Sequence, residues 1–401
     1  MFNKKNFNKI AYYLLSTLII KIVAELNLLL EHPLYLVILI FGITLLIQIY
    51  FYLFYYLRIL FYNNQKHKSA EKEPVSVIIC ARNEEKNLEE NLPSVLTQNY
   101  PDYEVVVVND CSEDESEFVL ERLKKTHKHL KITTIKKDEK FIHNKKLALT
   151  IGIKAAKNEI LLLTDADCKP ESNQWIDQMQ SNLHGQKSIV LGYGGYESRK
   201  SILNNLIRFD TLFIAIQYFA YALAGKPYMG VGRNLAYKKR LFFDNKGFAK
   251  HHHLESGDDD LFVNQVANKK NTAVEISSKA KTQSKPETKL SDWFKQKKRH
   301  TTTGKLYRFG SQWRLFLEQS SRFFYYISFI LSLVLFTKFY LYILIAFIFR
   351  SILQLTIIKV TMKRLNEKNL LLPSLIYDII LPWFNIVFVV SNIFTKKNRW
   401  R

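Results

Sequence analysis

One stretch of the sequence constrains the fold of this chain more than any other. Residues 34–62, LYLVILIFGITLLIQIYFYLFYYLRILFY, contain a single formal charge, Arg58. A helix needs about 20 apolar residues to cross a bilayer, and this stretch is longer. It therefore predicts a membrane-spanning helix. Residues 10–30 predict a weaker one, because Lys21 and Glu25 interrupt the apolar run and no cleavage site of a signal peptide follows.

Apolar segments return near the end of the chain, at residues 323–336, 339–359 and 370–394. The first is short at 14 residues, and Arg350 and Asp378 interrupt the other two. Three crossings would leave the basic tail outside the cell, against the positive-inside tendency, and two would leave residues 359–368 there. Residues 323–395 thus predict two or three spans. Residues 301–322 predict an amphipathic segment on the membrane surface.

The charges beside the first two helices predict their orientation. Basic segments at residues 1–5 and 63–68 lie at the outer ends of the two helices. If both helices cross the bilayer, both basic flanks lie in the cytoplasm. We therefore expect residues 1–66 to anchor the chain in the cell membrane (an inner or plasma membrane). The domain at residues 74–300 would then be cytoplasmic.

The composition limits the classes of molecule that the chain is expected to bind. Its 401 residues carry a net charge of +22, from 58 Lys and Arg against 36 Asp and Glu. Such an excess suits nucleic acid, an anionic substrate or an anionic lipid surface. No nucleic-acid recognition motif accompanies the charge, which argues against a nucleic-acid partner. The three cysteines form no Cys-x-x-Cys or Cys/His pattern, which suits a reducing compartment without structural zinc.

Residues 74–300 have the pattern of an α/β domain. Short aliphatic runs that end in polar residues stand at 75–80, 104–110 and 159–167. Helix-like stretches lie between them, at 83–98 and 146–157. This alternation predicts a parallel sheet that binds its ligands beyond the carboxyl ends of the strands. Segments 188–197 and 272–277 would add strands of mixed direction.

The ends of these predicted strands carry polar side chains. Asp165 and Asp167 end the third strand on one side of the chain, where two carboxylates can hold a hard divalent cation. Taken alone, this pattern also fits an ordinary turn. Residues 82–84 and Asp110 end the first two strands, and taken singly they fit helix caps. Together the three ends predict a binding site. The absence of GxxxxGK[ST] and GxGxxG after the strands argues against P-loop and Rossmann nucleotide binding.

Further candidates follow along the chain. Lys145 and Lys146 precede a helix-like run, where they suit either a diphosphate or a solvated face. Gly230 and Gly232 predict a close backbone approach, and Arg233 and Asn234 follow them directly. The apolar run at 203–225 fits equally a helix on the membrane surface or a buried core helix.

Three adjacent carboxylates, Asp258, Asp259 and Asp260, stand in the segment SGDDDLF. A neighbouring carboxylate raises the pKa of an aspartate and makes it a better base. The alternative is a solvated acidic loop or a helix start, where acidic groups favour the helix dipole.

In chain order, these motifs resemble those of the family 2 glycosyltransferases. The resemblance is to the membrane-integrated branch that includes cellulose, hyaluronan and poly-N-acetylglucosamine synthases. It rests on RNE (82–84), VND (108–110), DAD (165–167), GDD (257–259) and QKKRH (296–300). It covers residues 74–300 and extends to the flanking helices. It implies a GT-A type α/β domain. It also implies inverting transfer of a sugar to a glycan or lipid-linked acceptor, with UDP-sugars as the expected donors.

The resemblance also implies a role for each donor-side residue. Asp110 would bind the uridine end of the donor, with Arg82, Asn83 and Glu84 near the base. Lys145 would contact the donor. Asp165 and Asp167 would bind the diphosphate through Mg²⁺ or Mn²⁺.

On the acceptor side the resemblance is incomplete. Asp259 would be the base, with Asp258 beside it. The residues that would face the pyrophosphate and acceptor are Gln296, Arg299, His300, Arg233 and Asn234. The family has Trp after QxxR, where this chain has His300. This departure leaves open a processive polysaccharide synthase with possible membrane partner subunits, or a single transfer to a lipid-linked acceptor. A membrane sensor of nucleotides that has lost catalysis is a further alternative.

Overall fold

The computed structural model describes residues 34–63, 71–136, 144–252, 254 and 256–393. The helix predicted at residues 10–30 lies outside these ranges. The described chain falls into two compact units. The helical unit holds residues 34–50 and 317–352, and the α/β unit holds residues 51–316 and 353–393.

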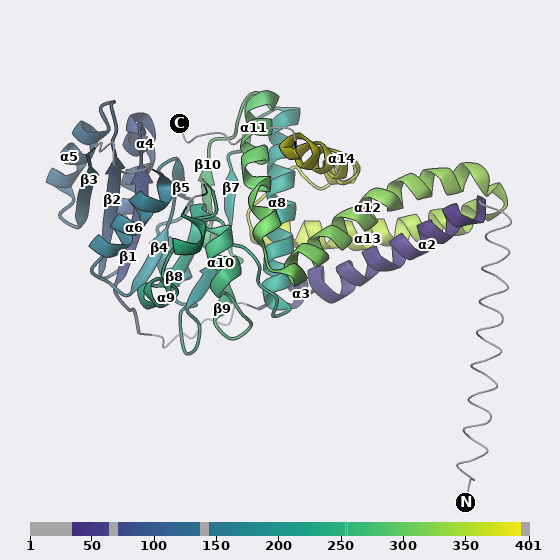
Figure 1. Ribbon diagram of the computed structural model, residues 1–401, viewed down its shortest axis with the longest axis horizontal. Coiled ribbons are helices and arrows are strands. Elements are labelled where there is room, and N and C mark those ends of the chain that lie inside the picture. Colours follow the sequence, from purple (N-terminus) through teal and green to yellow (C-terminus); the bar gives the residue numbers. More distant parts are fainter. Residues whose placement is uncertain (1–33, 64–70, 137–143, 253, 255, 394–401) are drawn as a thin grey trace, which may run out of the picture. The chain divides into compact units, whose positions relative to one another are not determined.

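The α/β unit is built on a mixed, mainly parallel sheet. Among the described residues it has seven strands, in the order β3-β2-β1-β4-β8-β6-β9 (Figure 1). Strands β1 to β4 run parallel, β8 runs antiparallel to β4 and β6, and β6 and β9 are parallel. The bounds are β1 Val75–Ala81, β2 Tyr103–Asp110, β3 Leu130–Ile135, β4 Ile160–Leu163, β6 Ile189–Leu191, β8 Leu235–Lys238 and β9 Thr272–Val274.

A smaller sheet accompanies the main one. It has the order β5-β10-β7, with β5 at Cys168–Pro170, β7 at Gly194–Tyr196 and β10 at Thr282–Ser284. The sequence predicted β1, β2, β4 and the strands in 188–197 and 272–277, and all of these are confirmed. It missed β3 and β8 and, in the smaller sheet, β5 and β10. Strand β3 is half-exposed and lacks a continuous apolar run, and β8 has only three apolar residues, followed directly by Lys238.

Helices cover both faces of the parallel strands because successive side chains of a strand point to opposite faces. Val77 and Val107 belong to the core that packs under α4 (Glu85–Leu96) and α5 (Ser116–Thr126). Ile78 and Val108 point the other way, against α6 (Lys145–Ala155). There, a Cβ on Gly152 would come within 2.8 Å of Ile78, so glycine permits the close approach of α6 to the sheet. The remaining short helices are α7 Trp175–Gln180, α9 Lys239–Asp244 and α10 Asp260–Val266.

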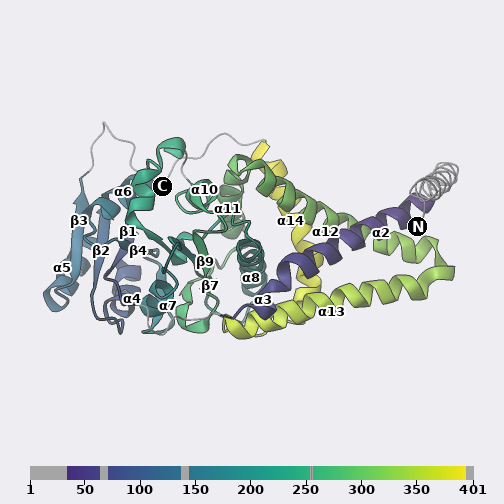
Figure 2. The same cartoon turned by 90° about the horizontal axis from the view of Figure 1, so that it is seen from below.

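Helix α8 (Ile202–Leu223) is apolar enough to cross a membrane, but most of its side chains are buried in the protein. The structure therefore decides between the two alternatives for residues 203–225 in favour of a core helix. Helices α8, α11 (Leu290–Thr301) and α14 (Pro373–Ile393) lie side by side (Figures 1 and 2). Trp293 of α11 packs on Phe388 of α14 with 5.7 Å between ring centroids.

A buried ionic cluster ties the C-terminal helices to the rest of the α/β unit. Glu367 lies in the loop after α13 (Tyr340–Arg364) and is fully buried. Its carboxylate accepts hydrogen bonds from Arg208 of α8 at 2.6 Å and from Lys281 at 2.9 Å. The Tyr193 hydroxyl donates to the same carboxylate at 3.2 Å. Each buried charge thus has a partner of opposite sign, which burial of a charge requires.

Three further described helices have the length and hydropathy of membrane spans. They cover Leu34–Phe61, Thr337–Arg364 and Pro373–Asn392, and less of each is buried. The first combines α2 (Leu34–Tyr50), the π-helix η1 (Phe51–Tyr56) and α3 (Arg58–Phe61). Helix α12 (Phe309–Leu335) runs through the expected border at residues 322 and 323 without a break, after the turn η5 (Thr303–Leu306). The domain limits drawn from the sequence remain predictions.

The helical unit buries the charge that interrupts its apolar sequence. Arg350 is fully buried and donates to the Tyr326 hydroxyl and the Gln48 side-chain oxygen, each at 2.9 Å. Gln48 in turn donates to Ser321 at 2.8 Å, and Arg322 pairs with Glu318 at 2.7 Å. Charged groups in a membrane helix are tolerated when they turn inward and bind other polar groups.

Candidate active site

The turns after β1 and β2 are joined to each other at the carboxyl edge of the sheet. Parallel pairing sets Ala81 beside Asn109, so Arg82, Asn83 and Glu84 follow one strand while Asp110 ends its neighbour. The Asn83 side chain accepts a hydrogen bond from the Glu113 backbone at 2.8 Å. The structure therefore brings these predicted donor-side residues together.

The backbone of both turns adopts an unusual conformation. Asn83 has a φ of 55° and Cys111 a φ of 54°, in the left-handed region that few residues other than glycine enter. Such conformations cost of order 1–3 kcal/mol and cluster at functional sites. Glu84 faces the third strand end as well. Its pKa is raised by burial and then by repulsion from Asp167 and Asp165.

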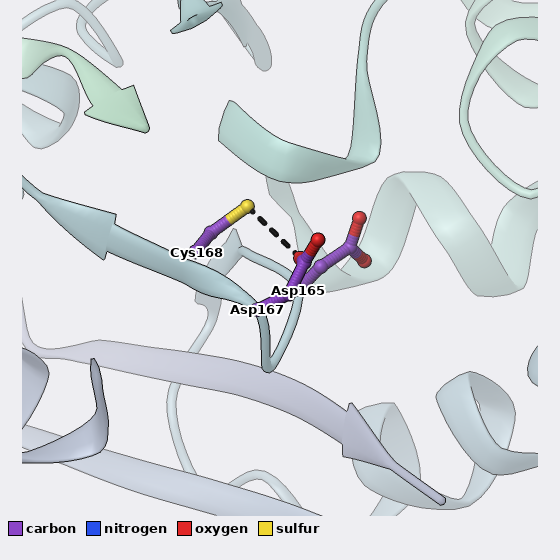
Figure 3. Close-up of side chains that lie close together, drawn as sticks. All are labelled: Asp165, Asp167 and Cys168. Carbon is purple, nitrogen blue, oxygen red and sulfur yellow. Dashed lines mark hydrogen bonds between the residues drawn. The ribbon is translucent and has the colours of Figure 1, made fainter. Parts of the chain in front are cut away.

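The third strand end carries a candidate metal site. Figure 3 shows the carboxylates of Asp165 and Asp167 beside each other at the turn from β4 to β5, with the Cys168 thiol near Asp167. One potential ligand atom from each residue lies within 4.8 Å of the other two. The Cys168 sulfur is 3.3 Å from an Asp167 oxygen.

The chemistry of this group fits a hard cation held by the two carboxylates. Burial and then repulsion from Asp167 and Asp165 raise the pKa of Cys168 well above its ordinary value, so its sulfur is a neutral thiol that donates to Asp167. Burial and repulsion from Asp165 also raise the pKa of Asp167. A divalent cation would relieve that repulsion, and carboxylate oxygens are the ligands that Mg²⁺ and Mn²⁺ prefer.

Lys145 joins this carboxylate pair to the three adjacent aspartates. It is the first residue of α6, which the Asn144 side chain caps by accepting from the Leu147 backbone. Its ammonium lies 2.7 Å from Asp165 and 3.1 Å from Asp258. Burial alone would lower the pKa of Lys145, but the nearby aspartates outweigh it and raise the pKa well above the ordinary value. Lys145 is therefore a fixed positive charge at the centre of the site.

The environment of Lys146 is neither the diphosphate site nor the solvated face that the sequence suggested. Its side chain is 3% exposed, and its ammonium donates to the backbone oxygens of His251, Leu254 and Ser256 at 2.7, 3.0 and 2.7 Å. Lys146 therefore does not lie on a solvated face, and its ammonium is not free to contact a diphosphate. Its three hydrogen-bonded partners all belong to the loop before the aspartates.

The three adjacent aspartates have three distinct environments. Burial opposes the charge of Asp258, but Lys145 prevails and lowers its pKa. Burial, followed by repulsion from Asp258 and Asp260, raises the pKa of Asp259 to about 7. Asp259 accepts from the Gly232 backbone at 2.6 Å and from the Asp260 backbone at 2.7 Å. Asp259 can thus exchange a proton near neutral pH, while Asp258 stays ionised.

Asp260 begins helix α10, as one alternative from the sequence proposed. Its carboxylate accepts from the hydroxyls of Thr303 and Tyr307. No signal in the sequence linked these two residues to the aspartates.

Arg233 follows the glycine that contacts Asp259. Its guanidinium stacks over Tyr196, 4.4 Å from the ring centroid, and donates to the Gly195 oxygen at 3.1 Å. The Tyr196 hydroxyl donates to Gln296 at 3.4 Å. Tyr196 thus connects two residues predicted for the pyrophosphate and acceptor side, and the sequence analysis missed it.

Asn234 lies beneath the site. It is fully buried, donates to the Tyr193 and Ala280 oxygens at 3.0 and 2.6 Å, and accepts from Trp175 at 3.0 Å. These bonds occupy both amide hydrogens. We predicted that Asn234 contacts the acceptor, but its side chain instead supports the core beneath the site.

Helix α11 carries the last motif. Arg299 and His300 are exposed to solvent at its C-terminal end, whereas Lys297 pairs with Asp210 of α8 at 2.7 Å. Desolvation by the surrounding protein, followed by repulsion from Arg299 and Lys297, lowers the pKa of His300 below its ordinary value. His300 is therefore neutral at pH 7. It takes the place where the family has Trp.

Comparison with known proteins shows what the α/β unit is similar to. Residues 76–242 match the family described as Glycosyl transferase family 2. This part of the chain is thus similar to a family 2 glycosyltransferase domain. The match spans β1, the turn at Asp165 and Asp167, and strand β8.

Individual relatives agree with this assignment. An uncharacterized glycosyltransferase of Haemophilus influenzae is 34% identical over 118 residues, 29% of this chain and 34% of that protein. A poly-beta-1,6-N-acetyl-D-glucosamine synthase of Staphylococcus epidermidis is 31% identical over 107 residues, 25% of this chain and 24% of that protein. The matched segments thus span about a quarter to a third of these relatives' own length.

A solved structure shows the same fold over most of the chain. It is a mannosyltransferase from Pyrobaculum calidifontis in complex with GDP-Man and Mn²⁺. It matches 91% of this chain and 99% of its own with a TM-score of 0.61 and 17% sequence identity. The α/β unit therefore has the GT-A type fold that the resemblance implied.

Proposed function

We propose that this protein is a membrane-integrated, metal-dependent inverting glycosyltransferase that transfers a sugar from a UDP-sugar to a glycan acceptor. One observation carries the proposal. Lys145 bridges the carboxylate pair of the candidate metal site to Asp258, directly beside Asp259 with its pKa of about 7. Lys145 thus lies between the proposed site for the leaving group and the aspartates that include the proposed base.

The residues fit the two ends of the reaction. Asp259 would take the proton from an acceptor hydroxyl as its oxygen attacks the anomeric carbon. The bond from that carbon to the diphosphate breaks, and the nucleoside diphosphate leaves with the electron pair. Lys145 and Arg299 would stabilise the negative charge that develops on it. Mg²⁺ or Mn²⁺, bound by Asp165 and Asp167, would supply further positive charge to the diphosphate oxygens.

The donor would enter along the carboxyl edge of the sheet. Asp110 is almost fully buried at the end of β2 and would bind the uridine, next to Arg82, Asn83 and Glu84. The Pyrobaculum structure holds a nucleotide-sugar and Mn²⁺ on the same fold, which supports this donor class. The base it holds is guanine, so GDP-sugars belong in the test.

The proposal has two forms, which differ in the acceptor: a growing glycan chain or a lipid-linked acceptor. The Staphylococcus epidermidis relative is named for a polysaccharide, which supports a growing glycan chain. His300 in place of Trp offers less ring area to a sugar, which favours a single transfer to a lipid-linked acceptor. Both acceptors suit a protein in the inner or plasma membrane whose family 2 domain faces the cytoplasm, where nucleotide-sugars are made.

The test is a donor screen with the full-length protein in detergent. UDP- and GDP-sugars are supplied with Mg²⁺ or Mn²⁺, and release of nucleoside diphosphate is followed. We expect release from one UDP-sugar in wild type and loss of release in Asp259→Asn. The control is Asp102→Asn, an exposed aspartate paired with Lys157 at 3.6 Å. Binding of UDP without release from any donor would refute the transferase and favour the sensor. A ladder of long products indicates polymerisation, and a single added sugar excludes it.

A further inference from the structure

The segment that carries Asp258 and Asp259 is held from both sides by buried charged residues. Lys146 contacts the loop that precedes it, and Asp260 contacts a turn that lies more than 40 residues further along the chain. Neither residue has a part in the chemistry proposed above.

Lys146 organises the loop in the manner of a bound cation. An ammonium group has three hydrogens to donate, and all three are accounted for by the oxygens of His251, Leu254 and Ser256. Ser256 is only two residues before Asp258. Burying a charge is costly unless it is fully hydrogen-bonded, so this lysine is stable only while the loop keeps its three oxygens converged.

Asp260 connects the same segment to the end of helix α11. One of its carboxylate oxygens accepts from both hydroxyls, that of Tyr307 at 2.7 Å and that of Thr303. The Thr303 hydroxyl also lies 2.9 Å from the backbone oxygen of His300. A short path therefore leads from the candidate base through Asp260 and Thr303 to the residues that would face the acceptor.

We propose that Lys146 and Asp260 are positioning residues that fix the distance between the base Asp259 and the acceptor side of the site on helix α11. This rests on the proposed function, in which Asp259 is the base. Lys146 holds the segment on its N-terminal side, and Asp260 ties it to Thr303 and Tyr307. A misplacement of about 1 Å between reacting groups can cost about 100-fold in rate.

The test removes each anchor and leaves the carboxylates in place. Lys146→Met keeps the length of the side chain without its donors, and Thr303→Val with Tyr307→Phe removes both hydroxyls at Asp260. Two matched controls lie nearby. Lys154→Met alters an exposed lysine of the same helix α6, and Thr302→Val removes a hydroxyl that bonds the Arg299 oxygen instead of Asp260.

We expect both anchor variants to lower kcat by about 10- to 100-fold. The donor KM and the affinity for UDP with Mn²⁺ should change less than about threefold, because the donor-side residues are untouched. The controls should match wild type in both. The single variant Tyr307→Phe, which keeps the ring, should fall between wild type and the double variant.

Hydrogen exchange gives a readout that needs no donor. We expect Lys146→Met to raise exchange in residues 256–266, and the double variant to raise it there and in residues 300–308. Wild-type exchange in both segments would overturn the proposal, as would kcat within about twofold of wild type. A fall in UDP affinity as large as the fall in kcat would also overturn it, because the role would then be general folding. Full turnover in Asp259→Asn would instead refute the assignment of the base, and the exchange results would still decide whether Lys146 and Asp260 hold the segment.

Discussion

The raised pKa of Asp259 predicts how the transfer rate depends on pH. As a base, Asp259 works in its deprotonated form, and its pKa is raised to about 7. With that value, about one tenth of the molecules carry the active form at pH 6 and about nine tenths at pH 8. The kcat/KM should therefore rise about tenfold between these two pH values, and activity is lost as the pH falls through 7.

Two groups beside Asp259 keep their charge across this pH range. Lys145 keeps its charge because its pKa lies well above the ordinary value, and Asp258 stays ionised because its pKa is lowered. Burial raises the pKa of Asp260, despite its hydrogen bonds from Thr303 and Tyr307. The pKa of His300 is lowered, so its ring stays neutral at pH 7 and above.

Initial rates of nucleoside diphosphate release provide the assay, measured from pH 5.5 to 8.5 at constant ionic strength and saturating metal. Enzyme incubated at each pH and returned to pH 8 must recover its full rate. Asp258→Asn removes a repelling charge, so it should move the midpoint of the surviving activity to lower pH. Asp259→Asn should lower the rate by about 10²- to 10⁴-fold, the usual contribution of a general base. A flat profile between pH 6 and 8 would refute the reasoning.

Three further predictions concern metal, stability and product length. Asp167→Asn should weaken Mn²⁺-dependent UDP binding at least tenfold, since loss of even an outer partner of a metal ligand costs about 10- to 100-fold; calorimetry showing equal affinity with metal would contradict its role. Glu367→Gln removes the carboxylate that pairs with buried Arg208, and stability should fall by about 3–5 kcal/mol. The exposed Glu89→Gln should cost less than about 1 kcal/mol, and equal thermal shifts in detergent would count against the cluster. His300→Trp should lengthen the products, as measured by mass spectrometry, and an unchanged length distribution would exclude His300 as the limit.

The sequence predicted the core of the fold and much of the candidate site because both depend on local patterns. Strands β1, β2 and β4 are continuous aliphatic runs, and the parallel arrangement that their alternation with helices predicts places their ends on one edge. Asp110 and Asp165 could therefore be assigned to one site from their positions alone. The edge strand β3 escaped prediction because its half-exposed side chains carry no such pattern.

Sequence by itself thus determined the central strands and the chemical groups that reach their carboxyl edge. The tertiary structure alone decided the environment of each group. Two adjacent lysines look alike in the sequence, yet Lys145 meets two carboxylates and Lys146 meets three backbone oxygens. Adjacent aspartates likewise differ in pKa because Lys145 approaches Asp258 more closely than Asp259 in the folded chain. The physical reason is that the pKa of a side chain depends on its burial and on nearby charges. Both are set by residues that folding brings together from distant positions in the chain.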